Sequence, residues 1–246
     1  MTKQPQTPFR LILERAADVI HRLPRIGRLM IINSREGVTH ERIGLLEAIT
    51  AEGEWLVCTG DSHHCRIHVP SIAKMVIDTS SVMAGKAYPR IDCYNSDDRA
   101  MFSVVSFEGL DPFLAAIEGL KTKPCLDARS PFEIKERSEA LPDDEGLVPL
   151  HAALTSGAVV AIGITRPGFS QESEGIIEKL VPSMGFINVM VPDFHFHLRA
   201  GAIGYWKRAS NEDGITLDAY DQNGAPLGLT LSSSSVTAFD VVEPAL

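Results

Sequence analysis

The sequence predicts an α+β fold made of two pseudo-symmetric repeats, each an antiparallel β-sheet (a meander) with flanking helices. Two observations predict it: a segment that recurs at a fixed offset, and short β-prone runs bounded by turn residues. The 246 residues suffice for one large domain or two small ones. A composition of 44% hydrophobic and 22% charged residues is that of a globular protein.

The recurring segment covers residues 35–49 and 166–180, which align at an offset of 131. Five of the fifteen positions are identical, whereas average residue usage gives about one. The identical pairs are Arg35/Arg166, Gly37/Gly168, Glu41/Glu172, Gly44/Gly175 and Glu47/Glu178. The offset continues through His64/His195 and Arg66/His197 and contracts to 126 further on, so the repeats cover about residues 27–106 and 157–232.

The first copy is predicted to begin with a helix over residues 8–23, where apolar residues recur at helical spacing until Pro24. A second helix is predicted over residues 111–120, with Asp111 at the N-cap and Pro112 behind it. Between them lie six short β-prone runs, over residues 29–33, 55–59, 65–69, 75–78, 90–94 and 101–105.

Residues 121–146 are charged and contain proline, which predicts a linker. The second copy is predicted to begin with a helix over residues 147–156 that ends at Gly157. Its six matching runs lie at residues 159–164, 186–191, 195–198, 203–208, 216–220 and 227–231. The expected domains are the first repeat with its N-terminal helix (1–120), the linker (121–146) and the second repeat (147–246).

Charge, hydropathy and missing motifs exclude several classes of function. The formal net charge of −9 lies in the second half of the chain, which argues against nucleic acid as a partner. No apolar run approaches the roughly 20 residues that cross a bilayer, so we expect no membrane insertion. The four cysteines have no CxxC spacing and follow no signal peptide, which predicts reduced thiols in the cytoplasm. The common nucleotide-binding and hydrolase motifs are absent.

Histidines cluster in one predicted strand of each copy. Because alternate strand residues share a face, His64 and Arg66 are predicted on one face of the first sheet, and His195 and His197 on the equivalent face of the second. Imidazoles at this spacing could hold a divalent ion such as Zn²⁺, although no carboxylate falls at structural-zinc spacing. They could also ligate haem iron, with arginine meeting the propionates. Half-exposed histidines without a ligand are the third alternative.

A haem also needs a broad apolar slot. The predicted sheets carry large apolar side chains that could line one, unless they belong to the core. They are Met75, Met83, Met101, Phe102, Met184, Met190 and Trp206.

Several motifs resemble those of the HemS/ChuS/ChuX-like haem-utilisation family. In the first copy they are IGRLMI (26–31), VTHE (38–41), HCRI (64–67) and IDCYN (91–95). The second copy is more similar: FINVM (186–190), FHFHL (194–198) and NEDGITLDAYDQNG (211–224) are similar to the family's WINV, FxLHL and TxDGxVTSLELFDxxG. The resemblance covers about residues 9–120 and 147–232.

The resemblance implies a cytoplasmic haem-binding protein for the utilisation, trafficking or storage of imported haem. It implies that Arg66 reaches the haem from the first copy and that His197 stands at the histidine of the LHL motif. The family's axial histidine lies in a helix before the second sheet, but residues 121–146 contain no histidine. The iron ligand is therefore expected elsewhere, first at His64, then at His195, His197 or His151.

The expected cofactor-binding residues are thus His64, Arg66, His195 and His197, with His64 as the metal ligand. Two other classes of function stay open: a regulatory or binding module that kept the fold and lost haem, and a divalent-metal protein that uses the His-rich strands. Some members of the family degrade haem with a reductant, so the sequence leaves enzymatic activity open. It also leaves a homodimer open.

Overall fold

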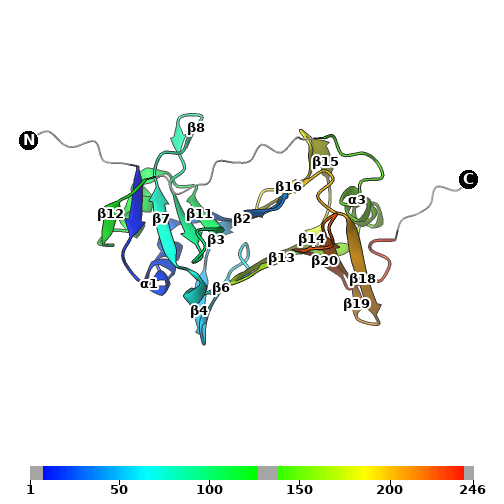
Figure 1. Ribbon diagram of the computed structural model, residues 1–246, viewed down its shortest axis with the longest axis horizontal. Coiled ribbons are helices and arrows are strands. Elements are labelled where there is room, and N and C mark those ends of the chain that lie inside the picture. The colour runs from blue at the N-terminus through cyan, green and yellow to red at the C-terminus, as the bar shows by residue number, and fades with distance from the viewer. Residues whose placement is uncertain (1–7, 127–137, 241–246) are drawn as a thin grey trace, which may run out of the picture. The chain divides into compact units, whose positions relative to one another are not determined.

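The computed structural model describes residues 8–126 and 138–240, which form two compact units (Figure 1). The first unit holds residues 8–32, 42–126 and 167–169. The second unit holds residues 33–41, 138–166 and 170–240. Each unit therefore includes a short hairpin turn from the other repeat copy.

The first unit contains six strands in the order β12-β1-β7-β10-β11-β2, and each neighbouring pair is antiparallel. Leu29, Ile31, Ile91 and Phe102 on these strands are buried and form its core. The strands are β1 (Phe9–Ile12), β2 (Arg28–Arg35), β7 (Lys74–Asp78), β10 (Arg90–Tyr94), β11 (Ala100–Ser106) and β12 (Thr122–Pro124).

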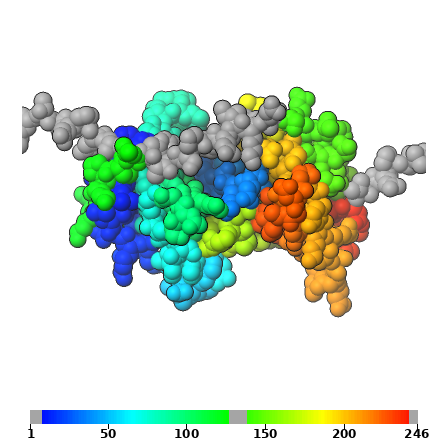
Figure 2. All heavy atoms as spheres, viewed as in Figure 1, coloured from blue at the N-terminus to red at the C-terminus, as the bar shows by residue number. Residues whose placement is uncertain are grey.

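A second group of strands in this unit is β4 (Ala48–Glu52), β5 (Trp55–Thr59) and β6 (Cys65–His68), paired in that order. The β4–β5 hairpin stands out as a blue to cyan lobe at the lower edge of Figure 2. The remaining elements are β8 (Val82–Met83), β9 (Lys86–Ala87), the helices α1 (Ala16–Ile20) and α2 (Leu110–Ala116), and two 3₁₀ turns at Leu23–Ile26 and Val69–Ser71.

The second unit contains two groups of strands and one helix, α3 (Leu147–Ser156). The first group runs β3-β17-β16-β15 and the second runs β18-β19-β20-β13-β14. The first group comprises β3 (Val38–Leu45, of which residues 38–41 lie in this unit), β15 (Leu180–Ser183), β16 (Phe186–Val191) and β17 (Phe194–Arg199). The second group comprises β13 (Val159–Arg166), β14 (Phe169–Ile176), β18 (Tyr205–Asn211), β19 (Gly214–Tyr220) and β20 (Pro226–Ser233).

The strands of the two copies correspond at the offsets found in the sequence. Strands β2 and β13 begin and end 131 positions apart, and so do β3 and β14. Later in the copies, β10 and β19 both end at a tyrosine, 126 positions apart. The predicted fold class, two repeats of antiparallel sheet with few helices, is confirmed.

Equivalent residues of the two copies also meet inside the second unit. His40 and Gln171, which are 131 positions apart and buried, are joined by a hydrogen bond of 2.8 Å from Gln171 Nε2 to His40 Nδ1. Because Nδ1 accepts, His40 donates from Nε2 to the carbonyl oxygen of Ile162 at 2.9 Å. Arg166 Nη2 donates to the carbonyl oxygen of its equivalent, Arg35, at 3.4 Å. The first hairpin turn is thus held by buried polar contacts.

The hairpin turn of the second copy packs in the first unit. The Phe169 ring is fully buried there and stacks on Phe102, with ring centroids 4.9 Å apart. The carbonyl oxygen of Gly168 accepts a hydrogen bond of 3.0 Å from the backbone nitrogen of His68. Gly168 has φ +79°, and a Cβ there would lie 2.6 Å from the Ser71 side chain, so this turn requires glycine.

Replacing Phe169 tests how much this turn of the second copy contributes to the stability of the first unit. We expect Phe169→Ala to lower the free energy of unfolding by about 3–5 kcal/mol, because it removes a fully buried ring. Urea denaturation followed by circular dichroism measures it. Val82→Ala, at a 64% exposed position, should change that free energy by less than about 0.5 kcal/mol. A loss below about 1 kcal/mol for Phe169→Ala would contradict the packing described.

The helix predicted over residues 8–23 is wrong in its first part. Residues Phe9–Ile12 form strand β1, which pairs on one side with β7 and on the other with β12, from the predicted linker. Only Ala16–Ile20 are α-helical. A short helix is marginal by itself, so backbone pairing with two strands outweighs the helical spacing of the apolar residues.

Other boundaries differ less from the prediction. Helix α2 starts at Leu110 with Gly109 at the N-cap, so Asp111 lies inside the first turn. Helix α3 has the predicted bounds and ends at Gly157, which adopts the left-handed conformation with φ +64°. Residues 127–137 of the predicted linker lie outside the described residues. Among the residues that the structure describes, no helix combines the length and apolar character that crossing a membrane requires.

Candidate functional site

The side chains of strand β17 alternate between two faces, as the sequence predicts. Phe194, Phe196 and Leu198 are buried, whereas His195 and His197 are half-buried. Because alternate residues of a strand point to opposite faces, the apolar residues anchor the strand in the core. The two imidazoles therefore lie together on the other face.

This face continues onto strand β16. The register places Met190 opposite His195, Asn188 opposite His197 and Phe186 opposite Arg199. Strand β3 adds Glu41, whose carboxylate contacts His195. We call this set the histidine face: Glu41, Phe186, Asn188, Met190, His195, His197 and Arg199.

Asn188 fixes the orientation of the His197 ring. Its Nδ2 donates to the carbonyl oxygens of Val181, at 2.7 Å, and Phe186, at 3.2 Å. Its Oδ1 therefore faces His197 and lies 2.6 Å from Nδ1. Because an amide oxygen only accepts, Nδ1 of His197 carries the proton, and Nε2 keeps its lone pair.

Burial lowers the pKa of the His197 imidazole from its usual value. The Glu41 carboxylate opposes this effect and His195 adds to it. Desolvation disfavours the charged form of a histidine, so the ring is predominantly neutral at pH 7. A neutral imidazole is the form that coordinates a metal ion.

His195 is oriented by a carboxylate. Its Nδ1 lies 3.2 Å from Oε2 of Glu41, and the two side chains are 27% and 15% exposed. The centroids of the His195 and His197 rings are 6.2 Å apart. One ligand atom from each of Glu41, His195 and His197 can be chosen such that all three lie within 4.8 Å of one another. The structure thus brings together two predicted site residues and one residue that the prediction omitted.

A hollow of about 480 Å³ adjoins this face and shares Phe186, Asn188 and Met190 with it. Met184 and Met190 are 78% and 55% exposed, which is unusual for large apolar side chains. Methionines adapt their shape to a bound apolar group. The full lining is Lys179, Val181, Ser183, Met184, Phe186, Asn188 and Met190.

The other two predicted site residues, His64 and Arg66, belong to the first unit. Both are exposed, and His64 lies immediately before strand β6. Arg66 makes an ion pair of 3.2 Å with Glu52 and lies 5.4 Å from the centroid of the Trp55 ring. The guanidinium is therefore already bound by neighbours in its own unit.

The remaining candidates divide between core and surface. Met75, Met101 and Phe102 are buried in the core, whereas Met83 is 65% exposed. Trp206 donates its Nε1–H to the carbonyl oxygen of Glu145 at 2.7 Å. His151 is exposed on helix α3. Of the seven side chains predicted to line an apolar slot, Met184 and Met190 line the hollow beside the histidine face.

Sequence reasoning missed Glu41, Asn188 and Lys179 as site residues. Glu41 stands 154 positions before His195 and reaches it only because β3 lies beside β17. Asn188 had a signal, since it is the asparagine of the FINVM motif directly opposite the FHFHL histidine. Lys179 had none, because nothing in its surroundings distinguishes it from a surface lysine.

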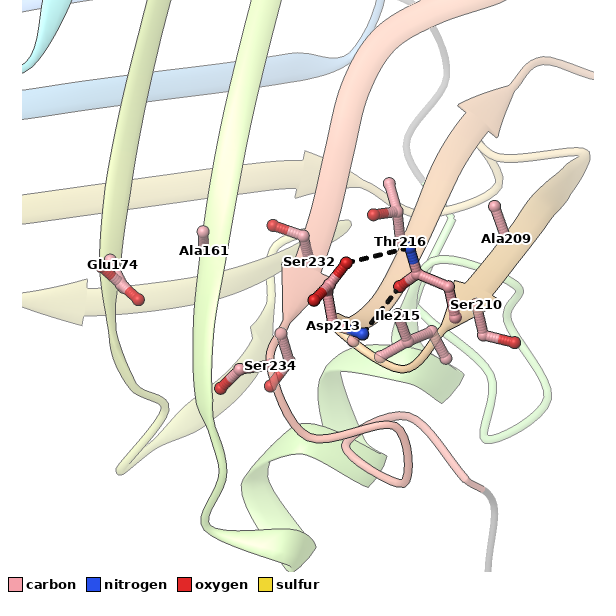
Figure 3. Close-up of a pocket in the computed structure, with 12 residues that line it drawn as sticks. Ala161, Glu174, Ala209, Ser210, Asp213, Ile215, Thr216, Ser232 and Ser234 are labelled. Carbon is pink, nitrogen blue, oxygen red and sulfur yellow. Dashed lines mark hydrogen bonds between the residues drawn. The ribbon is translucent and has the colours of Figure 1, made fainter.

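A second hollow, of about 470 Å³, lies over strands β13, β18, β19 and β20 (Figure 3). Hydroxyl groups of Ser210, Thr216 and Ser232 and the carboxylates of Glu174 and Asp213 line it. Its lining includes no histidine and no basic side chain. The predicted site residues and this hollow are therefore separate.

These features define a two-repeat protein of antiparallel sheets that carries an imidazole pair beside an apolar hollow. The sequence matches no protein-family model and no curated protein. Solved structures do match it. ChuS from E. coli, described as a haem oxygenase, superimposes with a TM-score of 0.74 over 92% of this chain and 83% of ChuS, at 16% identity.

PhuS from Pseudomonas aeruginosa, described as a haem-binding protein, matches comparably. Its apo structure gives a TM-score of 0.72 over 91% of this chain and 81% of PhuS, at 18% identity. Its holo structure gives 0.71 at 16% identity, over 96% and 82% of the two chains. At these identities the likeness shows the fold, and the fold that the sequence motifs implied is confirmed.

His63, next to the predicted site residue His64, makes the free energy of unfolding depend on pH. His63 is fully buried, and its Nε2 lies 3.3 Å from the carbonyl oxygen of Gly44. Burial lowers its pKa to about 4. An unfolded chain binds this proton below about pH 6.5, so the stabilisation is complete above that pH and is lost as the pH falls toward 4.

We expect His63 alone to reduce the free energy of unfolding by about 2.5 kcal/mol between pH 7 and pH 4.5. Urea unfolding at both pH values measures this change. His63→Gln should show a loss smaller than the wild type by about that amount. His64→Gln, at the exposed neighbouring position, should retain the wild-type loss. Equal losses in wild type and His63→Gln would contradict the assignment.

Proposed function

We propose that this protein binds haem on its histidine face, as a cytoplasmic protein for haem utilisation, trafficking or storage. The observation that carries the proposal is His197, whose available Nε2 lies on the same face as an apolar hollow. Haem iron is commonly held by a histidine nitrogen, while the porphyrin needs an apolar surface. The fold supports the proposal, because PhuS and ChuS are described as a haem-binding protein and a haem oxygenase.

The chemistry of the side chains fits this ligand. His197 would hold the iron, with His195 beside it as the second imidazole. Met184, Phe186 and Met190 would contact the porphyrin, and the ammonium group of Lys179 would meet a propionate. Asn188 keeps the His197 ring in place through its Nδ1, which leaves Nε2 for the iron.

The proposed compartment rests on the thiols. Cys58, Cys65 and Cys93 are buried and reduced, and burial raises the pKa of Cys93 well above its usual range. Such thiols are typical of proteins in a reducing compartment and are inert toward oxidants.

A haemin titration of the purified protein, followed by absorbance in the Soret region at pH 7, tests the iron ligand. We expect a saturable shift with one haem per chain, and His197→Ala should weaken binding at least tenfold because it removes the iron ligand. His21→Ala, at an exposed position just after helix α1, should bind as the wild type does.

The same titration of His64→Ala tests the residue that the sequence analysis expects first as the iron ligand. We expect no change, since His64 is not one of the residues of the histidine face. A tenfold loss in His64→Ala together with wild-type binding by His197→Ala would move the iron ligand to His64. If the wild type shows no saturable shift, the proposed function is wrong.

The proposed contact between Met190 and the porphyrin has a separate test. Met190→Gln keeps the size of the side chain but makes it polar, so haemin affinity should fall about fivefold through lost apolar contact. The position of the Soret band should stay unchanged because His197 is retained. Met83→Gln, at a comparably exposed methionine of the first unit, is the matched control and should bind normally. A Met190→Gln affinity equal to that of the control would remove Met190 from the contact surface.

A further inference from the structure

Three metal-ligating side chains converge on the histidine face: Glu41 from strand β3, and His195 and His197 from strand β17. Their candidate ligand atoms lie within 4.8 Å of one another. Glu41 Oε2 and His195 Nδ1 are already 3.2 Å apart. The sequence spacing offered no carboxylate beside these histidines, and the fold supplies one from 154 positions away.

The distances suit a single ion. Ligand atoms bound tetrahedrally at about 2.0–2.1 Å lie about 3.3 Å from each other. Glu41 Oε2 and His195 Nδ1 already lie at about that distance, and the proton that now joins them in a hydrogen bond would be released when the ion binds. The other pairs of ligand atoms are at most roughly 1.5 Å farther apart than this value.

Two features prepare the imidazoles for a metal ion. Metal-ligating histidines almost always hydrogen-bond through their other ring nitrogen to a carbonyl oxygen or carboxylate, which fixes the tautomer. His197 has this arrangement, because Asn188 Oδ1 holds its Nδ1 and Asn188 is itself held by two backbone carbonyl oxygens. The buried residues Phe196 and Leu198 hold the strand from its other face.

The Glu41 carboxylate favours a cation at this position. Its side chain is only 15% exposed, and the ion-pair partner that the structure gives it is His195. A divalent ion bound here would offset this half-buried negative charge.

The equivalent positions of the repeat do not provide this set of ligands. The positions that correspond to Glu41, His195 and His197 hold Glu172, His64 and Arg66. A guanidinium stays protonated and has no lone pair to donate to a metal. The convergence is therefore a property of the second unit and not of the repeat as such.

We propose that Glu41, His195 and His197 bind one divalent first-row transition-metal ion, such as Zn²⁺, and leave its remaining coordination positions open. Two histidines and one carboxylate are a ligand set used for Zn²⁺ and for non-haem Fe²⁺. This site goes beyond the proposed function, because it needs no haem. It shares His197 with the proposed haem site, so the ion and haem exclude one another there.

Co²⁺ is the probe, because it takes zinc sites and absorbs visible light when bound. Titration of the haem-free protein should show one saturable Co²⁺ site per chain, from which added Zn²⁺ displaces the Co²⁺. Glu41→Gln should weaken Co²⁺ binding at least tenfold, since an amide replaces the charged ligand. The matched control is Glu172→Gln, at the equivalent position of the other copy, which should bind as the wild type does.

Circular dichroism checks that each variant is folded, and His195→Gln serves as the second variant if Glu41→Gln is not. Absence of a saturable Co²⁺ site in the wild type would overturn the metal proposal. The metal proposal would also be overturned if a folded Glu41→Gln or His195→Gln variant bound Co²⁺ as tightly as the wild type does.

Haemin titration of Glu41→Gln separates the two proposals. This variant should lose far less affinity for haemin than for Co²⁺, because the proposed iron ligand, His197, is retained. If Co²⁺ binding depends on Glu41 and the wild type binds no haemin, the metal proposal is supported and the haem proposal is overturned. Haemin binding without a Co²⁺ site would do the reverse. Zn²⁺ at saturation should also weaken haemin binding, and an unaffected titration would overturn the shared use of His197.

Discussion

The alternation of side chains along strand β17 is the constraint on which the site depends. Phe194, Phe196 and Leu198 can be buried only if the intervening residues point to the opposite face. A shift of one position would place two imidazoles in the core, where unpaired polar groups are costly. Apolar packing on one face therefore fixes the position of His195 and His197 on the other, before any ligand is considered.

Packing alone does not determine which ring nitrogen of an imidazole carries the proton. In this site hydrogen bonds determine it. The amide of Asn188 is fixed by two backbone carbonyl oxygens, and it in turn fixes the proton on Nδ1 of His197. Glu41 orients His195 in a comparable way. His197 thus has an outer hydrogen-bond partner on its other ring nitrogen, which is the arrangement typical of ligand-binding histidines.

The fold was largely predictable because the repeat is visible in the sequence, and strands with an apolar face repeat at the same offsets. Strands β3 and β14 escaped prediction because their buried faces carry polar side chains, His40 and Arg42 in one and Gln171 and Ser173 in the other. Their hydrogen bonds come from distant segments, which no local pattern reveals. The same limit applies to the site: the face of His197 follows from alternation, whereas the approach of Glu41 depends on which strands become neighbours.

Comparison of the two copies shows how one fold gives two different surfaces. Val57 lies opposite Arg66 in the first copy, just as Asn188 lies opposite His197 in the second. The register is thus the same, but valine cannot orient a neighbouring ring, and Arg66 binds Glu52 and Trp55 instead. Strand geometry is shared by both copies, so the difference in chemistry resides in a few side chains on one face. Those side chains, and not the repeat, distinguish the second unit as the proposed place for a metal ion or an iron porphyrin.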